Sequence, residues 1–163
     1  MKLQYLGDSK DSFKWDYHDY LINSLRFKYL DIILMLTPDD NTKQGKTEPD
    51  WFPARNEIIK FCHELKSKKD ILKLKELPYK TKSNYKVIIH KPDIFISNSS
   101  REYYFKNIEN HHKQIILLDP DNGFEPEKSY FKKHIRYCEI KKILEQISDK
   151  SIISVFQHFR KKI

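Results

Sequence analysis

The sequence predicts a three-layer α/β domain, and two observations carry that prediction. Short apolar runs of strand length alternate along the chain with stretches in which apolar residues recur at three- and four-residue steps, as on one face of a helix. Strands that alternate with helices pair into a mostly parallel sheet with helices on both faces. The 163 residues, 39% of them hydrophobic, supply the core of a single domain over residues 1–163.

The N-terminal segment predicts a strand, a turn and a helix. The strand is expected at Lys2–Leu6, and Gly7 after it permits a tight turn. Asp8 or Ser9 can cap the following helix, because their side chains accept hydrogen bonds from its first backbone N–H groups. Apolar and aromatic residues at helical spacing place that helix at about Asp11–Phe27.

The next elements are a strand, a long loop and two helices. The apolar run Asp31–Leu36 predicts a buried strand. The longest polar stretch, Thr37–Trp51, predicts an exposed loop, and loops of this length are often lids or binding segments. Proline suits the first turn of a helix, so Pro53 marks the start of a helix that continues to about Lys66. A short helix at Asp70–Leu77 ends before a proline.

The second half of the chain continues the alternation and completes the prediction of a Rossmann-like fold. Its expected elements, in order, are strands at Tyr85–Ile89 and Asp93–Ile96, a helix at Arg101–His112, a strand at Ile115–Leu118, a loop at Phe124–Tyr130, an extended piece at His134–Tyr137, a helix at Glu139–Ile147 and a strand at Ser151–Gln157.

Composition argues against several classes of protein. Three glycines in the whole chain disfavour a glycine-rich phosphate loop. Cys62 and Cys138 lie far apart with no other cysteine, which disfavours a disulfide framework and a four-ligand zinc site and favours a reducing, cytoplasmic setting. The N-terminus lacks the apolar core of a signal peptide, and no apolar run approaches the roughly 20 residues that span a bilayer. We therefore expect no membrane segment.

The positive charge is concentrated near the C-terminus. The segment Lys128–Lys162 holds ten Lys or Arg against three acidic residues, which accounts for +7 of the net charge of +8. A basic segment of this kind favours nucleic acid as a partner. Two alternatives stay open: lysine-rich solvated faces that reflect an AT-rich genome, and attraction to an anionic membrane surface.

The motif Asp-Pro-Asp-Asn-Gly at residues 119–123 is the main candidate site. It directly follows the apolar run Ile115–Leu118, and the carboxyl ends of strands are where open α/β sheets bind ligands. Asp119 and Asp121 could share one Mg2+ or Mn2+, since hard cations prefer carboxylate oxygens. The alternative is that the motif is simply a turn, for which Asn-Gly is a favourable sequence.

Three further residues have both a functional and a structural interpretation. Asp8, at the end of the expected first strand, could bind a metal or a ribose hydroxyl, or could act only as a helix cap. Lys14 could reach a phosphate, although a solvated lysine is the usual case. His158, after the last expected strand, could act as a general acid or base, or could lie unused at the surface.

The chain also carries the loose spacing of a PD-(D/E)xK nuclease. In this interpretation Asp121 and Glu139 bind the metal and Lys141 positions the attacking water. Such a site requires its Glu and Lys on a strand, whereas the spacing around Glu139 predicts a helix.

The strand that ends in Asp119-Pro120, followed by a loop, a helix and the apolar run at 152–156, resembles the second half of Rossmann-type nucleic-acid methyltransferases, in particular three-Cys-motif partner proteins. In that family an Asp-Pro pair ends the fourth strand and lines the substrate site. The resemblance implies S-adenosylmethionine as cofactor, bound near Gly7 and Asp8. The glycine-rich cofactor loop of the family is reduced here to the single Gly7.

These observations give three functional hypotheses. The leading one is a nuclease-like enzyme of phosphodiester chemistry, with a metal on Asp119 and Asp121, assistance from Asp8 and proton transfer by His158. The second is a divergent S-adenosylmethionine-dependent nucleic-acid methyltransferase. The third is a non-enzymatic basic interaction protein of a mobile element. The residues expected to bind phosphate are Lys132, Lys133, Arg136 and Arg160.

Overall fold

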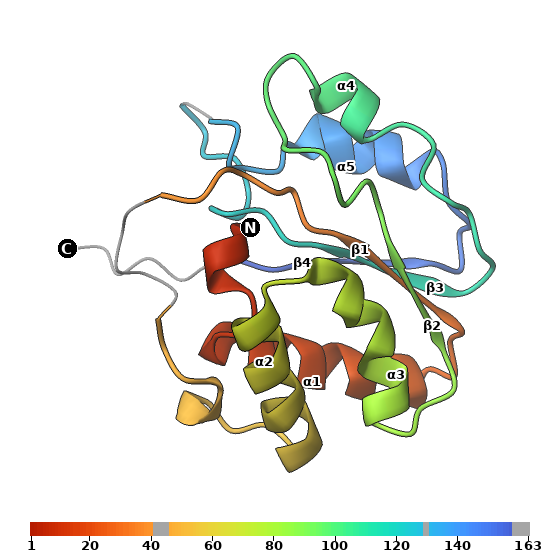
Figure 1. Cartoon of the computed structure of the whole chain (residues 1–163). Helices are drawn as coiled ribbons and strands as arrows, with labels where there is room; N and C mark the ends of the chain where they lie inside the picture. The colour runs from red at the N-terminus through yellow and green to blue at the C-terminus, as the bar shows by residue number, and fades with distance from the viewer. Residues whose placement is uncertain (41–45, 129–130, 158–163) are drawn as a thin grey trace.

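The computed structural model is built on a four-stranded, all-parallel sheet with the strand order β2-β1-β3-β4 (Figure 1). It describes residues 1–40, 46–128 and 131–157. The α/β, Rossmann-like fold class predicted from the alternation of strands and helices is confirmed. The strands are β1 (Tyr29–Ile33), β2 (Lys86–Ile89), β3 (Gln114–Leu118) and β4 (Ile152–Val155).

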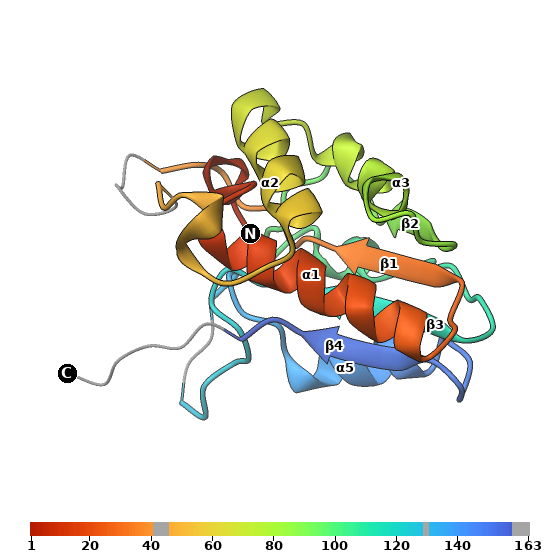
Figure 2. The same cartoon turned by 90° about the horizontal axis from the view of Figure 1, so that it is seen from below.

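Helices cover both faces of this sheet (Figures 1 and 2). One face carries the three helices α1, α2 and α3, and the opposite face carries α4 and α5, which gives the three layers. The helices are α1 (Ser9–Ser24), α2 (Asn56–Lys68), α3 (Leu77–Lys80), α4 (Arg101–Tyr104) and α5 (Tyr137–Leu144), with 3-10 turns η1 (Leu3–Tyr5), η2 (Pro49–Trp51) and η3 (Ile71–Glu76).

The central strand β3 supplies both hydrophobic cores. All five of its residues are buried, and successive side chains point to opposite faces of the sheet. Ile115 and Leu117 pack into the core under α1 and α2, which also contains Trp15 and Phe61. Ile116 and Leu118 pack into the core under α4 and α5. An uninterrupted apolar run is therefore what this position in the sheet requires.

The predicted strand at Lys2–Leu6 is wrong. The segment forms the 3-10 turn η1, closed by hydrogen bonds from the Tyr5 and Leu6 amides to the carbonyls of Lys2 and Leu3, three residues earlier. Its apolar residue Leu6 is completely buried in the core beside α2, so the segment packs on a helix and not along a strand edge. The apolar residues of this segment do not alternate clearly with polar ones, so the sequence did not distinguish packing on a helix from pairing in a sheet.

Several element boundaries also differ from the prediction. The strand expected at Asp31–Leu36 is the shorter β1, because Met35 has a φ of 47° and leaves the extended conformation. The helix expected at Arg101–His112 is only the single turn α4, and Asn107, with a φ of 59°, prevents its continuation. The strand expected at Asp93–Ile96 does not form, although the Ile96 amide donates a hydrogen bond to the carbonyl of Leu36 in the segment after β1.

The secondary structure of two further short segments also differs from the prediction. The helix expected at Asp70–Leu77 is the 3-10 turn η3 followed by α3, whose first turn accommodates Pro78 because that position needs no amide hydrogen. The extended piece at His134–Tyr137 reduces to one bridge between Ile135 and Phe124, and helix α5 begins already at Tyr137.

Among the described residues, no helix has the length and apolar character needed to cross a bilayer.

Candidate functional site

The candidate site is a cavity of about 720 Å3 at the edge of the sheet where β1, β3 and β4 end. We call it the carboxyl-edge cavity. The chain leaves β1 for β2 on one side of the sheet and later returns to β3 on the other side, and such a switch point is where open parallel sheets bind ligands. Its wall comes from the N-terminal turn, the first turns of α1, the segment 47–52 and the loops after β3 and β4, with the residues Met1, Lys2, Tyr5, Asp8, Ser9, Lys10, Asp11, Lys14, Asp40, Thr47, Trp51, Phe52, Asp119, Asp121, Asn122, Lys133 and Phe156.

The sequence-predicted carboxylates therefore meet in one place. Asp8 comes from the start of α1, and Asp119 and Asp121 follow β3, yet all three line the carboxyl-edge cavity. The parallel arrangement explains this convergence, since the carboxyl ends of neighbouring strands lie at the same edge of the sheet.

Lys14 occupies the floor of the cavity between two carboxylates. Its Nζ lies 2.6 Å from Asp11 Oδ1 and 2.5 Å from Asp119 Oδ2, and the three side chains are almost fully buried. Burial alone would lower the pKa of Lys14, but the two carboxylates more than offset it and the pKa is raised. The interpretation of Lys14 as a solvated lysine is wrong: its side chain is 2% exposed and its ammonium is paired.

Asp8 is the N-cap of α1, as one of the two sequence interpretations proposed. Its Oδ1 accepts hydrogen bonds from the backbone amides of Lys10 at 2.9 Å and Asp11 at 3.0 Å. Burial, together with the nearby charge of Asp11, raises the pKa of Asp8 to about 6. The same carboxyl group lines the cavity, so the cap places a titratable acid at the site.

Gly7 is explained by packing against α2. Its φ is 80°, and a Cβ there would overlap the carbonyl oxygen of Cys62 and the amide of Lys66. Its own amide donates to Asp11 Oδ2 at 2.8 Å. Gly7 thus permits a close approach between the turn and a helix, which is a different role from the close approach to a cofactor that the sequence suggested.

Asp121 is held at the cavity wall by its neighbours. Its Oδ2 accepts a hydrogen bond from Thr37 Oγ1 at 3.1 Å and lies 3.5 Å from Lys133 Nζ. The turn that carries Asp121 is tied to a second loop, because Asn122 N donates to the carbonyl of Lys133 and Ile135 N donates to that of Gly123, both at 2.9 Å. The acidic turn is therefore fixed in place and its carboxylate faces the cavity.

The described residues do not form a complete protein cage for a metal ion. Within residues 1–40, 46–128 and 131–157, no three His, Cys, Asp or Glu side chains lie close enough together to hold one. Lys14 lies 2.5 Å from Asp119, whereas Lys133 lies 3.5 Å from Asp121, so Asp121 is the carboxylate better placed to contact an ion. Mg2+ is usually bound by one or two protein carboxylates, with waters and substrate phosphate oxygens as its other ligands. The carboxylates present here fit Mg2+ or Mn2+ bound in this way.

The predicted phosphate-binding residues take different positions. Lys133 lines the carboxyl-edge cavity, and Lys132 lies beside it in the same loop. Arg136 lies farther along, at the start of α5, where it pairs with Glu139. His158 and Arg160 lie outside the described residues.

Glu139 has a structural position that differs from that of a nuclease metal ligand. It lies on helix α5 with a side chain that is 4% exposed, and its oxygens accept hydrogen bonds from Arg101 at 2.5 and 2.6 Å and from Arg136 at 2.9 Å. Although burial would raise the pKa of Glu139, these arginine contacts lower it. The helix predicted there from sequence spacing is confirmed, and the strand that a PD-(D/E)xK site requires is not present at Glu139.

Sequence reasoning missed two features of the site. The aromatic side chains of Trp51 and Phe52, which are 72% and 46% exposed, line the cavity from the 47–52 segment. Thr37, which orients Asp121, also escaped notice. The signal for the aromatic pair was available, because two adjacent aromatic residues at the end of a long polar stretch are unusual for a simple loop.

Comparison of the chain with protein-family models, with curated proteins and with solved structures found no match. The geometry of the carboxyl-edge cavity is therefore the basis for assigning a function to this chain.

Proposed function

We propose that this protein is an enzyme that cleaves phosphodiester bonds of nucleic acid, with its reaction centre in the carboxyl-edge cavity. One observation carries the proposal: Asp8, Asp119 and Asp121, from separate segments, line one cavity at the switch point of a parallel sheet, with Lys133 beside them. Carboxylates and a lysine at such an edge suit a ligand that brings both phosphate and a divalent cation.

Mg2+ or Mn2+, when bound, would stabilise negative charge that develops on the phosphate. Asp121 would hold the ion, and Thr37 keeps that carboxylate oriented through its hydroxyl hydrogen bond. Lys133, 3.5 Å from Asp121, can bind a neighbouring phosphate oxygen. The pair of Lys14 and Asp119 forms the rigid floor beneath them.

Asp8 is the described residue best suited to move a proton. Its pKa of about 6 lies close to neutrality, so both protonation states are accessible near physiological pH. In the protonated form the carboxyl group can donate to a departing oxygen. The backbone amides of Lys10 and Asp11 fix its orientation.

The test is cleavage of end-labelled single- and double-stranded DNA and RNA with Mg2+ or Mn2+, and with EDTA as the metal-free condition. Asp121→Asn keeps the size of the side chain and its bond to Thr37, so we expect a folded protein without metal-dependent cleavage. The matched control is Asp93→Asn, an exposed acid outside the cavity, which should retain wild-type activity. Metal-dependent cleavage by Asp121→Asn at the wild-type rate would overturn the proposal.

A second candidate function is methyl transfer with S-adenosylmethionine. It is favoured by the position of Asp119-Pro120 at the end of β3, which neighbours β1 on the side opposite β2. The resemblance to nucleic-acid methyltransferases implies an Asp-Pro pair at the end of the fourth strand, whereas here the pair ends the third strand of the chain. Against it, the segment after β1, residues 34–40, contains no glycine for a close approach to the cofactor.

Calorimetric titration with S-adenosylmethionine separates the two enzymes. Binding with a matching rise in melting temperature, together with absence of metal-dependent cleavage, would replace the nuclease proposal by the methyltransferase. Absence of heat and of a thermal shift at millimolar ligand removes the methyltransferase. If neither activity is found but nucleic acid binds in a strongly salt-dependent way, the protein is a basic binding module.

A further inference from the structure

We propose that a single-stranded nucleic acid lies along three adjoining cavities that lead from the carboxyl-edge cavity to the groove between α4 and α5. This inference rests on the proposed function and names its substrate class. The second cavity, about 390 Å3, is lined by Asn98, Asn122, Phe131, Lys132 and Lys133, and we call it the loop cavity.

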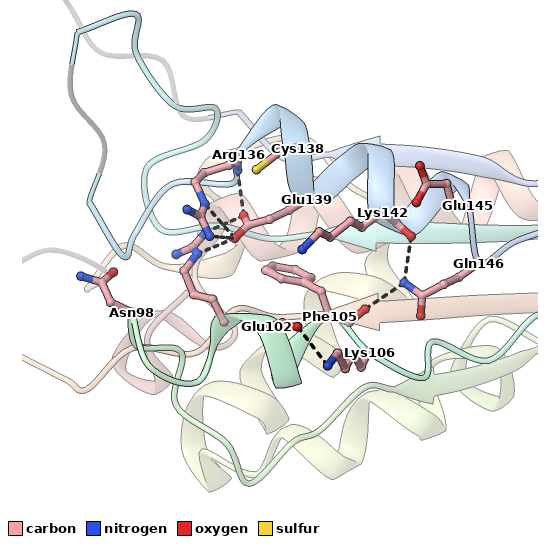
Figure 3. Close-up of a pocket in the computed structure, with 11 residues that line it drawn as sticks. Asn98, Glu102, Phe105, Lys106, Arg136, Cys138, Glu139, Lys142, Glu145 and Gln146 are labelled. Atoms are coloured by element: carbon pink, nitrogen blue, oxygen red, sulfur yellow. Dashed lines mark hydrogen bonds and ion pairs between the residues drawn. The ribbon is translucent and has the colours of Figure 1, made fainter.

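Shared residues join the three cavities into one path. Asn122 and Lys133 line both the carboxyl-edge cavity and the loop cavity. Asn98 lines both the loop cavity and a third cavity of about 510 Å3, the α4–α5 cavity. In Figure 3, Asn98 lies at one end of the α4–α5 cavity and Gln146 at the other. A ligand long enough to leave the reaction centre therefore has a continuous surface to follow.

The loop cavity is the part of this path with the most favourable charge for a polyanion. The reaction end holds the carboxylates, whereas among the described residues the loop cavity is lined by two lysines, two asparagines and a phenylalanine, without an acid. The α4–α5 cavity is lined by four basic and three acidic residues, and Lys142 and Phe105 project between its helices (Figure 3). Within the described part of the chain, neither Lys132 nor Lys142 makes an ion pair, so both ammonium groups are available for phosphate.

The exposed aromatic rings along the path favour single-stranded nucleic acid over a duplex. Phe131 is 65% exposed at the loop cavity, and Trp51 and Phe52 line the carboxyl-edge cavity. Aromatic rings beside lysines are the features with which proteins bind unpaired bases, because each base can stack on a ring while its phosphate meets an ammonium group. The bases of a duplex are already stacked and paired, so these rings would contribute little to the binding of a duplex.

The binding test uses a fluorescein-labelled oligonucleotide of about 12 nucleotides in EDTA, which prevents metal-dependent cleavage, and follows its anisotropy. Phe131→Ala should weaken binding roughly tenfold. Lys132→Ala should weaken it too and lower the slope of log affinity against log salt by about 0.7. Controls of the same chemistry lie off the path: Tyr79→Ala, at a ring that is 84% exposed on α3, and Lys60→Ala, on α2, should bind as wild type.

Two further measurements test the course of the path. Lys142→Ala should weaken binding of the oligonucleotide of about 12 nucleotides but leave that of one of about 4 nucleotides unchanged, because the short strand does not reach the α4–α5 cavity. Of the two tryptophans, Trp51 is exposed and Trp15 is completely buried, so quenching of tryptophan fluorescence by the strand should vanish in Trp51→Phe.

The path is overturned if Phe131→Ala and Lys132→Ala bind like their controls, if a duplex binds as tightly as the single strand, or if affinity is independent of salt, which would indicate a protein partner. Cleavage sensitive to Asp121→Asn in a protein whose path variants behave as wild type would remove the path and leave the enzyme. Binding that follows the expected pattern without any cleavage would keep the path and remove the proposed enzyme.

Discussion

The ammonium group of Lys14 and the carboxylate of Asp119 form an ion pair at 2.5 Å in which each side chain is only 2% exposed. The pair joins the first helix to the end of the central strand β3, across 105 residues of sequence. Asp11 contacts the same ammonium at 2.6 Å, so Lys14 pairs with two buried carboxylates. The floor of the cavity thus depends on Lys14 for its electrostatic balance.

Lys14→Met should therefore destabilise the protein strongly. The methionine fills a similar volume but leaves Asp11 and Asp119 buried without their cation, which we expect to cost about 3–5 kcal/mol of unfolding free energy at neutral pH. Urea unfolding measures this loss, with Lys60→Met on the exposed face of α2 as a control expected to change stability by less than about 0.5 kcal/mol. An equal effect of the two substitutions would show that the buried pair contributes nothing specific.

Gly7 and Gly123, the two glycines that the structure describes, both have a positive φ but should respond differently to alanine. At Gly7 a Cβ meets the backbone of α2, which cannot move aside, so Gly7→Ala should lose about 2–4 kcal/mol of unfolding free energy. At Gly123 the obstacle is the exposed side chain of Gln157, which can rotate away but then loses its hydrogen bond from the Phe124 amide. Gly123→Ala should therefore lose the backbone strain of about 1–2 kcal/mol and about 0.5 kcal/mol for this bond. Thermal denaturation compares the two variants. Equal losses would contradict the packing role of Gly7.

The parts of the fold that could be predicted from sequence are those specified locally. The run from Ile115 to Leu118 is apolar, free of turn-forming residues and closed by Asp-Pro-Asp-Asn-Gly, so its identity as a buried strand and the placement of Asp119 and Asp121 at its end followed directly. The Asp8 cap was also predictable, because an N-cap requires only the residue and the helix beside it.

The features that escaped prediction depend on partners distant in the chain. Lys14 looks like an ordinary surface lysine until the fold brings Asp119 to it from the far end of the sheet. The segment Lys2–Leu6 is apolar enough for a strand, but its tertiary position on α2 determined its conformation. The continuity of the three cavities likewise arises from loops that meet only after folding.

Arg101 should be more important for stability than Arg136, although both contact Glu139. Arg101 is buried, binds both oxygens of Glu139 and donates to the carbonyls of Lys132 and His134 at 3.0 and 2.7 Å. Arg101→Met would leave a buried carboxylate half-paired and two loop carbonyls unsatisfied, at a cost of about 3–5 kcal/mol.

Arg136→Met is the matched comparison for this pair. The Arg136 side chain is 25% exposed and Glu139 would keep both bonds from Arg101, so the loss should be less than about 1 kcal/mol. Chemical denaturation of the two variants measures the difference. Because Arg101 also holds the loop that carries Lys133, its loss should weaken oligonucleotide binding as well. Equal stability of the two variants would contradict the assignment of Arg101 as the anchor of this loop.

Asp31 should make stability depend on pH in the opposite sense to an ordinary carboxylate. It lies within β1 and is 3% exposed, and its Oδ2 has no hydrogen-bond partner among the described residues. Burial, with a smaller contribution from Glu109, raises its pKa to about 7. The unfolded chain ionises this group near its ordinary pKa of 3.8, so the folded state is progressively penalised as the pH rises from about 4 to about 7, and the full penalty applies above that range.

Asp31→Asn removes the charge and keeps the shape, so it should stabilise the protein at about pH 8 by on the order of 2–4 kcal/mol and change its stability little at about pH 3, where the carboxyl group is neutral in both states. Melting temperatures of wild type and variant across this range measure the effect, and Asp93→Asn, at an exposed acid, should show no comparable trend. A difference between wild type and Asp31→Asn that stays constant with pH would mean that Asp31 is ionised without penalty in the folded protein, and that water or a structural change compensates its burial in the sheet.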